Sequence, residues 1–175
     1  RKKEIQDTLS YNVHNNNINK IILLNERIYS DKELGISSKK IKQVVINKRL
    51  TYKDVFDYVK TIEDNKYIIL SNSDIFFDAT INRIKISGLT TKKKLFSLLR
   101  YEYKNGVALN KSPLFGPRPD SQDTWIWHNK WKIPNNVIKI LDIQLGKSGC
   151  DNKIVYLLNI LGFACFNEPL FIKTY

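Results

Sequence analysis

Residues 67–78 read YIILSNSDIFFD, an apolar run that ends in a polar and acidic cluster before the chain turns apolar again. Tyr67–Leu70 has the length and composition of a buried strand. Asp74 follows it, and open α/β sheets bind ligands beyond the carboxyl ends of their strands. The stretch therefore predicts a strand that carries a carboxylate to a cleft. Turn formation or helix capping is the simpler alternative for such an Asp.

Around this stretch, strand-like and helix-like patterns alternate with short connections, which favours a largely parallel sheet with right-handed crossovers. Thr51 and Asp54 have the spacing of a capping box. The long Gly- and Pro-containing segment 104–123 is predicted to be a functional or mobile loop. Helices are expected at residues 1–15, 51–62 and 151–161, and strands at residues 18–24, 40–46, 67–70, 84–87, 95–103, 125–127, 163–166 and 171–174.

The composition indicates one globular domain. The chain has 175 residues, of which 42% are hydrophobic, and its two cysteines are too few for a disulfide framework. No apolar run approaches the roughly 20 residues of a membrane span. We therefore expect a reducing, cytoplasmic setting, with membrane association as a variant of it.

The charge balance points to anionic partners. Lys and Arg total 29 against 17 Asp and Glu, for a net charge of +12. The lysines are spread along the chain and form neither one helix face nor a known reader motif. A basic nucleic-acid-binding module without catalysis is therefore the weaker alternative to a protein that handles a phosphate-bearing substrate.

Two further segments carry acidic groups in positions suited to chemistry. The first, SQDTWIW at 121–127, ends the long loop with Asp123 and suits a base or hydrogen-bond acceptor facing a cleft, or else a turn cap. The second, LGKSGCDN at 145–152, leads into a helix at Asp151 and Asn152, where free N–H groups suit an anion. Its Gly-Lys-Ser is not a phosphate-binding P-loop, because Leu141 stands where that motif needs Gly.

Taken together, NSDIFFD, SQDTWIW and LGKSGCDN, followed by Asn167-Glu168-Pro169 and residues 172–175, resemble a nucleotide-sugar glycosyltransferase family of the GT-A type found in bacteria and large DNA viruses. The resemblance implies a Rossmann-like three-layer α/β/α sandwich with a mostly parallel central sheet. It implies that Asn72, Ser73 and Asp74 stand in for the DxD-like motif, with Asp74 contacting either the Mn²⁺ or Mg²⁺ ion or the ribose. Asn72 departs from the strict motif, which has Asp there.

The same resemblance implies that Asp123 is the catalytic base on the acceptor side, while Asp151 and Asn152 contact the sugar or diphosphate. The expected activity is transfer of a hexosyl or deoxyhexosyl group from a nucleoside-diphosphate sugar, expected to be UDP-linked, to a hydroxyl of a glycan or lipid-linked acceptor. A nucleotidyltransferase on a similar sheet is a further alternative. Residues 1–175 are expected to form one domain that the family would extend by a strand before Arg1 and a His after Tyr175. For a viral member of the family, the resemblance implies a setting in the host-cell cytoplasm. Oligomeric state is left open.

Overall fold

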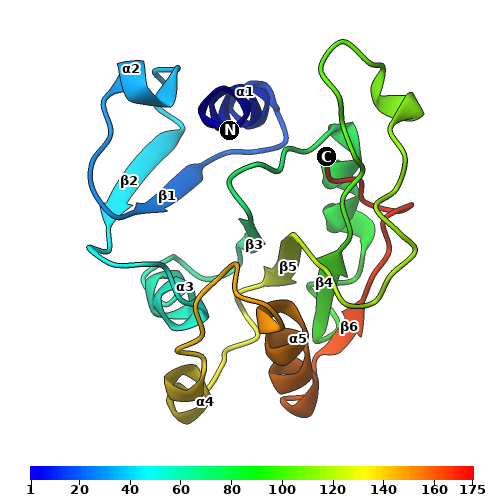
Figure 1. Cartoon of the computed structure of the whole chain (residues 1–175). Coiled ribbons are helices and arrows are strands. Elements are labelled where there is room, and N and C mark those ends of the chain that lie inside the picture. The colour runs from blue at the N-terminus through cyan, green and yellow to red at the C-terminus, as the bar shows by residue number, and fades with distance from the viewer.

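A computed structural model describes residues 1–175 and shows a mixed α/β fold with two hydrogen-bonded sheets (Figure 1). The α-helices are α1 (Lys2–His14), α2 (Asp31–Leu34), α3 (Tyr52–Val59), α4 (Asn135–Ile140) and α5 (Cys150–Ile160), and the 3-10 helices are η1 (Ala79–Ile86) and η2 (Leu109–Lys111). The strands are β1 (Ile21–Asn25), β2 (Ile41–Val45), β3 (Tyr67–Ser71), β4 (Lys94–Leu98), β5 (Thr124–His128) and β6 (Ala164–Phe166). No helix is both long and apolar enough to cross a bilayer.

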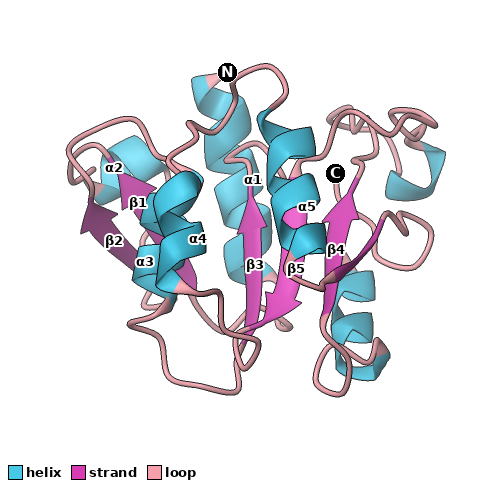
Figure 2. Ribbon diagram, turned by 90° about the horizontal axis from the view of Figure 1, so that it is seen from below, coloured by secondary structure: helices cyan, strands magenta, loops and turns pink.

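The sheets contain parallel pairings, but the larger one is not mostly parallel. β1 pairs with β2 in parallel, whereas the second sheet has the order β3-β5-β4-β6. In it β5 runs antiparallel to both neighbours, and β4 and β6 are parallel. β3, β4 and β6 therefore share one direction, and Figure 2 shows β3 and β4 pointing opposite to β5. The long loop leaves the sheet at the end of β4 and re-enters it at the same end, since Leu98 pairs with Thr124. β5 therefore runs in the opposite direction to β4.

Two apolar clusters cover the two faces of the larger sheet. On one face, Trp125 and Trp127 pack with α3, α4 and α5. On the other, Ile126 packs with η1 and with the segment before the C-terminus. Successive strand residues point to opposite faces, so the alternation in TWIWH supplies both cores from one central strand. Figure 1 shows α3, α4 and α5 on one side of the sheets and α1 on the other, so the arrangement is layered.

Each sheet has an edge strand that is unpaired on one side. β1 is bonded only to β2, and β3 only to β5. From the ladder registers, the backbone groups of Ile22 and Leu24 on β1, and of Tyr67 and Ile69 on β3, point away from their partners. All four residues are only partly buried. A row of unpaired N–H and C=O groups on an apolar strand is a template for another strand.

Several predicted elements are confirmed and others are corrected. The capping box of Thr51 and Asp54 is present, and Gly162 follows α5 with a φ of 82°. The strand predicted at 84–87 is wrong, because residues 79–86 form η1, in which Ile81 and Ile84 share one buried face. The strand predicted at 95–103 stops at Leu98, and the one predicted at 171–174 is reduced to a single bridge to Thr174. The short helices α2 and α4 were not predicted.

Candidate functional site

A large cavity lies where β3 and β4 end and β5 begins. Its volume is about 1020 Å³, and its walls come from α1, the loop after β3, the loop after β4, Asp123 and Tyr175. Both chain termini lie at this end of the sheet (Figure 2). The cavity contains Asp74 and Asp123, two of the carboxylates that the sequence singles out.

Asp123 is held rigidly between two strands. Its backbone N–H donates to Leu98 O at 3.1 Å, and its carbonyl accepts from Asn72 N at 3.0 Å, so it extends both ladders of β5. Its side chain accepts a hydrogen bond from Asn72 Nδ2 at 2.8 Å. The first and second motifs are therefore in direct contact, as a common site requires.

Arg100 balances the charge of Asp123. Its guanidinium donates to Asp123 Oδ2 at 2.8 Å and to Glu102 Oε1 at 2.9 Å, and it lies over the ring of Phe115. Burial lowers the pKa of Arg100, but the hydrogen bond from its guanidinium to Asp123 and the attraction of that carboxylate outweigh the effect, so the net pKa is raised. Both Asp123 oxygens are thus engaged, and the ion pair fixes the direction in which the carboxylate points.

Asp74 differs from Asp123 because its carboxylate is half-buried in the cavity and makes no hydrogen bond or ion pair with the protein. The backbone beside it is nonetheless anchored by α1. Asn12 Nδ2 donates to Ile75 O at 2.8 Å, and Asn12 Oδ1 accepts from Phe77 N at 3.2 Å. A rigid loop therefore presents a carboxylate whose acceptor capacity is unused, which is the state expected of a ligand-binding group.

Stacked aromatic rings line the wall beside Asp74. Phe76 lies between Tyr11 and Tyr175, with ring centroids 4.6 and 5.4 Å away, and Tyr103 meets Phe76 edge-on at 5.2 Å. The pKa of Tyr175 is raised by burial and by the nearby Asp78 carboxylate, to which its hydroxyl lies hydrogen-bonded at 3.2 Å. The wall offers apolar ring faces bordered by hydroxyl groups.

The cavity is acidic although the protein is basic. Five carboxylates and two basic side chains, Lys3 and Arg100, line it. Arg100 is committed to Asp123 and Glu102, and Lys3 is paired with Asp7 at 2.8 Å. A free diphosphate would be repelled here. The lining suits either neutral hydroxyl groups or an anion that arrives with its own cation.

The donor set for Mn²⁺ or Mg²⁺ is small. No group of three or more carboxylate, His or Cys side chains is arranged so that it could hold a metal ion. The Asp123 carboxylate is already bonded to Asn72 and Arg100. Asp74 is therefore the half-buried carboxylate that remains available to bind a cation. One protein carboxylate fits a divalent cation whose other ligands are water and substrate phosphate oxygens.

The remaining predicted residues lie nearby but outside the cavity lining. Asp151 Oδ2 accepts from Gln122 N at 3.4 Å, which links the third motif to the residue before Asp123. Ser73 and Asn152 are exposed. Five buried side-chain polar atoms in the chain lack a partner, and three of them flank Asp123; these are Gln122 Oε1, Thr124 Oγ1 and Trp125 Nε1. Such a concentration is typical of functional sites.

Sequence analysis did not single out Arg100 or the aromatic wall. An Arg directly after the apolar run LFSLL was an available signal, because a cation at a strand end faces the same edge as Asp74. The ring of Tyr11 gave no such signal, since it comes from α1 and meets Phe76 only through the fold.

No family model and no curated protein matches the chain. One solved structure is similar, a Bacillus anthracis protein described as a glucose-1-phosphate thymidylyltransferase and determined with sucrose bound. The two share 12% sequence identity with a TM-score of 0.47, over 93% of this chain and 73% of that chain.

Proposed function

We propose that the chain is a sugar-nucleotide-dependent glycosyltransferase domain whose large cavity holds the transferred sugar and the acceptor hydroxyl. The observation that carries the proposal is the pairing of an unpartnered carboxylate, Asp74, with the fixed Asn72–Asp123–Arg100 network in one cavity. Carboxylates accept hydrogen bonds from sugar hydroxyls. The partly exposed rings of Tyr11 and Tyr103 suit the C–H edges of a sugar ring, because aromatic faces carry partial negative charge.

Each residue has a distinct role in this proposal. Asp74 binds the metal-bound diphosphate or the ribose, and Asn72 and Arg100 orient Asp123 toward the acceptor hydroxyl. Asp123 takes the proton of that hydroxyl as general base in an inverting reaction, on an oxygen lone pair that the contacts with Asn72 and Arg100 leave free. Mn²⁺ or Mg²⁺, when bound, supplies the positive charge that a departing diphosphate needs.

Two features favour this proposal over nucleic-acid binding. The cavity carries three more negative than positive side chains, which opposes a bare polyphosphate backbone. It is also a hollow rather than a groove lined with cations. A nucleotidyltransferase would need a nucleoside triphosphate and a sugar phosphate in the same space, and the test below includes that pair.

A thermal-shift screen tests the proposal directly. UDP, UDP-sugars, nucleoside triphosphates with a sugar phosphate, and a random oligonucleotide are compared with and without Mn²⁺. A ligand at 100 times its Kd stabilises the native state by about 2.7 kcal/mol, which raises the Tm of a domain this size by about 5–10 °C. A Mn²⁺-dependent shift with UDP-sugars is expected. Shifts with triphosphate or oligonucleotide alone would refute the assignment.

We also propose that a parallel strand, such as the resemblance implies before Arg1, pairs between β1 and β3. It would satisfy the open backbone groups of Ile22, Leu24 and Ile69 and join the two sheets. Amide hydrogen exchange checks this when it is measured on a longer protein that includes the natural sequence upstream of Arg1. Slowed exchange of the Ile22 and Ile69 amides relative to residues 1–175 alone is expected, and unchanged exchange would refute it.

A further inference from the structure

A second, smaller pocket lies at the far end of β5 from Asp123. Its volume is about 220 Å³, roughly that of seven waters in the liquid. α3, the turn after β5 and α4 line it, and it shares no residue with the large cavity. Five residues of β5 separate Asp123 from Asn129, which is about 17 Å of strand.

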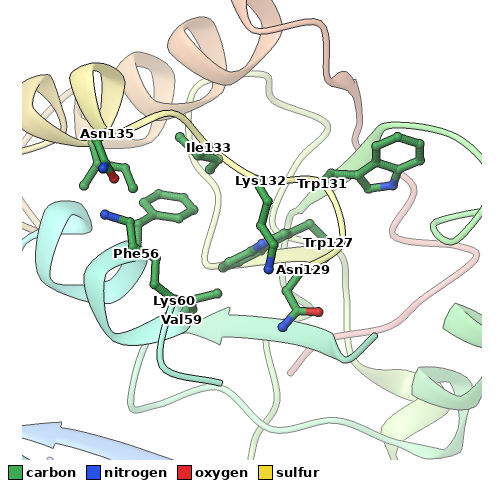
Figure 3. A pocket seen from close by; sticks show the side chains of 10 residues that line it. Phe56, Val59, Lys60, Trp127, Asn129, Trp131, Lys132, Ile133 and Asn135 are labelled. Atoms are coloured by element: carbon green, nitrogen blue, oxygen red, sulfur yellow. The ribbon is translucent and has the colours of Figure 1, made fainter. Parts of the chain in front are cut away.

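The floor and walls of this pocket are apolar. Six of its ten lining residues are hydrophobic, with Phe56 and Trp127 as buried members whose ring centroids lie 5.4 Å apart. Val59 and Ile133 complete the wall (Figure 3). The pocket therefore accepts an apolar body smaller than a nucleotide.

One polar group in the pocket, the indole N–H of a largely buried ring, makes no hydrogen bond with the protein. Trp127 is 2% exposed, and its indole N–H makes no hydrogen bond with the protein, whereas the neighbouring Trp131 indole N–H donates to Leu89 O at 2.8 Å. Buried indole N–H groups normally find an acceptor. The free N–H of Trp127 therefore marks a place for a ligand oxygen.

Two lysines lie at the rim of the pocket, and their positive charge favours a negatively charged ligand oxygen. The Lys132 side chain extends toward the Trp127 indole in Figure 3. Lys132 is paired with Asp64 and Lys60 with Asp57, but these side chains are 41–64% exposed. Exposed ion pairs contribute little, so a ligand anion can take over either ammonium group at small cost.

We infer that this pocket binds a small monocarboxylate with an aromatic or branched apolar body. The apolar part packs on Phe56 and Trp127, and the carboxylate accepts from the Trp127 N–H and from Lys132. A phosphate, which needs more donors than one N–H and an ammonium group, is less well matched. The pocket lies apart from the glycosyl-transfer site, so the inference stands independently of the proposed function.

Fluorine NMR of the full chain tests the inference with three probes of similar size. 4-Fluorophenylacetate is expected to bind with a Kd at or below about 1 mM, 4-fluorophenethyl alcohol about tenfold more weakly, and 4-fluorobenzylamine not measurably. Lys132→Met is expected to weaken the carboxylate about tenfold. Lys139→Met is the matched control, because Lys139 is an exposed lysine on α4 that does not line the pocket, so its replacement should leave binding unchanged.

Two further variants separate the pocket from other sites. Val59→Phe fills the hollow and is expected to abolish binding, and Trp127→Phe removes the N–H donor and weakens it. If Trp127→Phe does not fold, the binding measurements on Val59→Phe and Lys132→Met test the inference. The inference is overturned if the carboxylate fails to bind at millimolar concentrations, if the alcohol or amine binds equally well, or if Val59→Phe leaves the affinity unchanged.

Discussion

Replacing Asp74 with Asn tests the central carboxylate with little risk to the fold. Asp74 makes no hydrogen bond or ion pair, and Asn12 anchors the backbone after it. We therefore expect the free energy of unfolding to change by no more than about 0.5 kcal/mol. Loss of one charged contact to a developing diphosphate should lower kcat by about 10²–10³-fold, or about 2.7–4 kcal/mol.

The assay combines sugar transfer from the donor identified by the thermal-shift screen with urea denaturation of parent and variant. Asp57→Asn is the control, because it removes the same charge on α3 outside the cavity. It should retain parent activity. If Asp74→Asn turns over substrate near the parent rate and keeps the Mn²⁺-dependent shift, Asp74 is a turn residue and the reasoning fails.

Three more predictions concern β5 and Asp123, the residue before it. Asp123→Asn should lose turnover while the Kd for UDP stays within about twofold, since an acceptor-side base does not hold the diphosphate; equal turnover would remove its role as base. Thr124→Val should be neutral or stabilising by about 1 kcal/mol in urea, because the buried Thr124 hydroxyl has no partner; a large loss would reveal an unseen partner. The pKa of His128 is lowered, first by burial and then by Lys130, so the unfolded state binds more protons below pH about 6.5. The free energy of unfolding should therefore fall as the pH is lowered from 7.5 to 5.5, by at most about 1.4 kcal/mol per pH unit. His128→Gln should reduce this dependence of stability on pH, and an unchanged slope would contradict the prediction.

Local signals in the sequence were sufficient for several elements. The capping box at Thr51, the glycine after α5 and the amphipathic pattern of α1 each depend on residues within one or two turns of each other. The polar end of the apolar run 67–70 also indicated one wall of the large cavity, because strand ends gather at one edge of a sheet. Asn72 and Asp123 are 51 positions apart in the sequence and were expected in one site. In the structure a hydrogen bond joins their side chains.

Only the tertiary structure decided how these parts face one another. The reversed direction of β5 depends on pairing with β3 and β4 across long loops, and an apolar run has the same pattern in either direction. The partners of Asp123 likewise follow from strand order, which brings Arg100 from the segment after β4 beside it while leaving Asp74 free. Periodicity reports which face of an element is buried, whereas pairing and charge balance arise from contacts between segments distant in the chain.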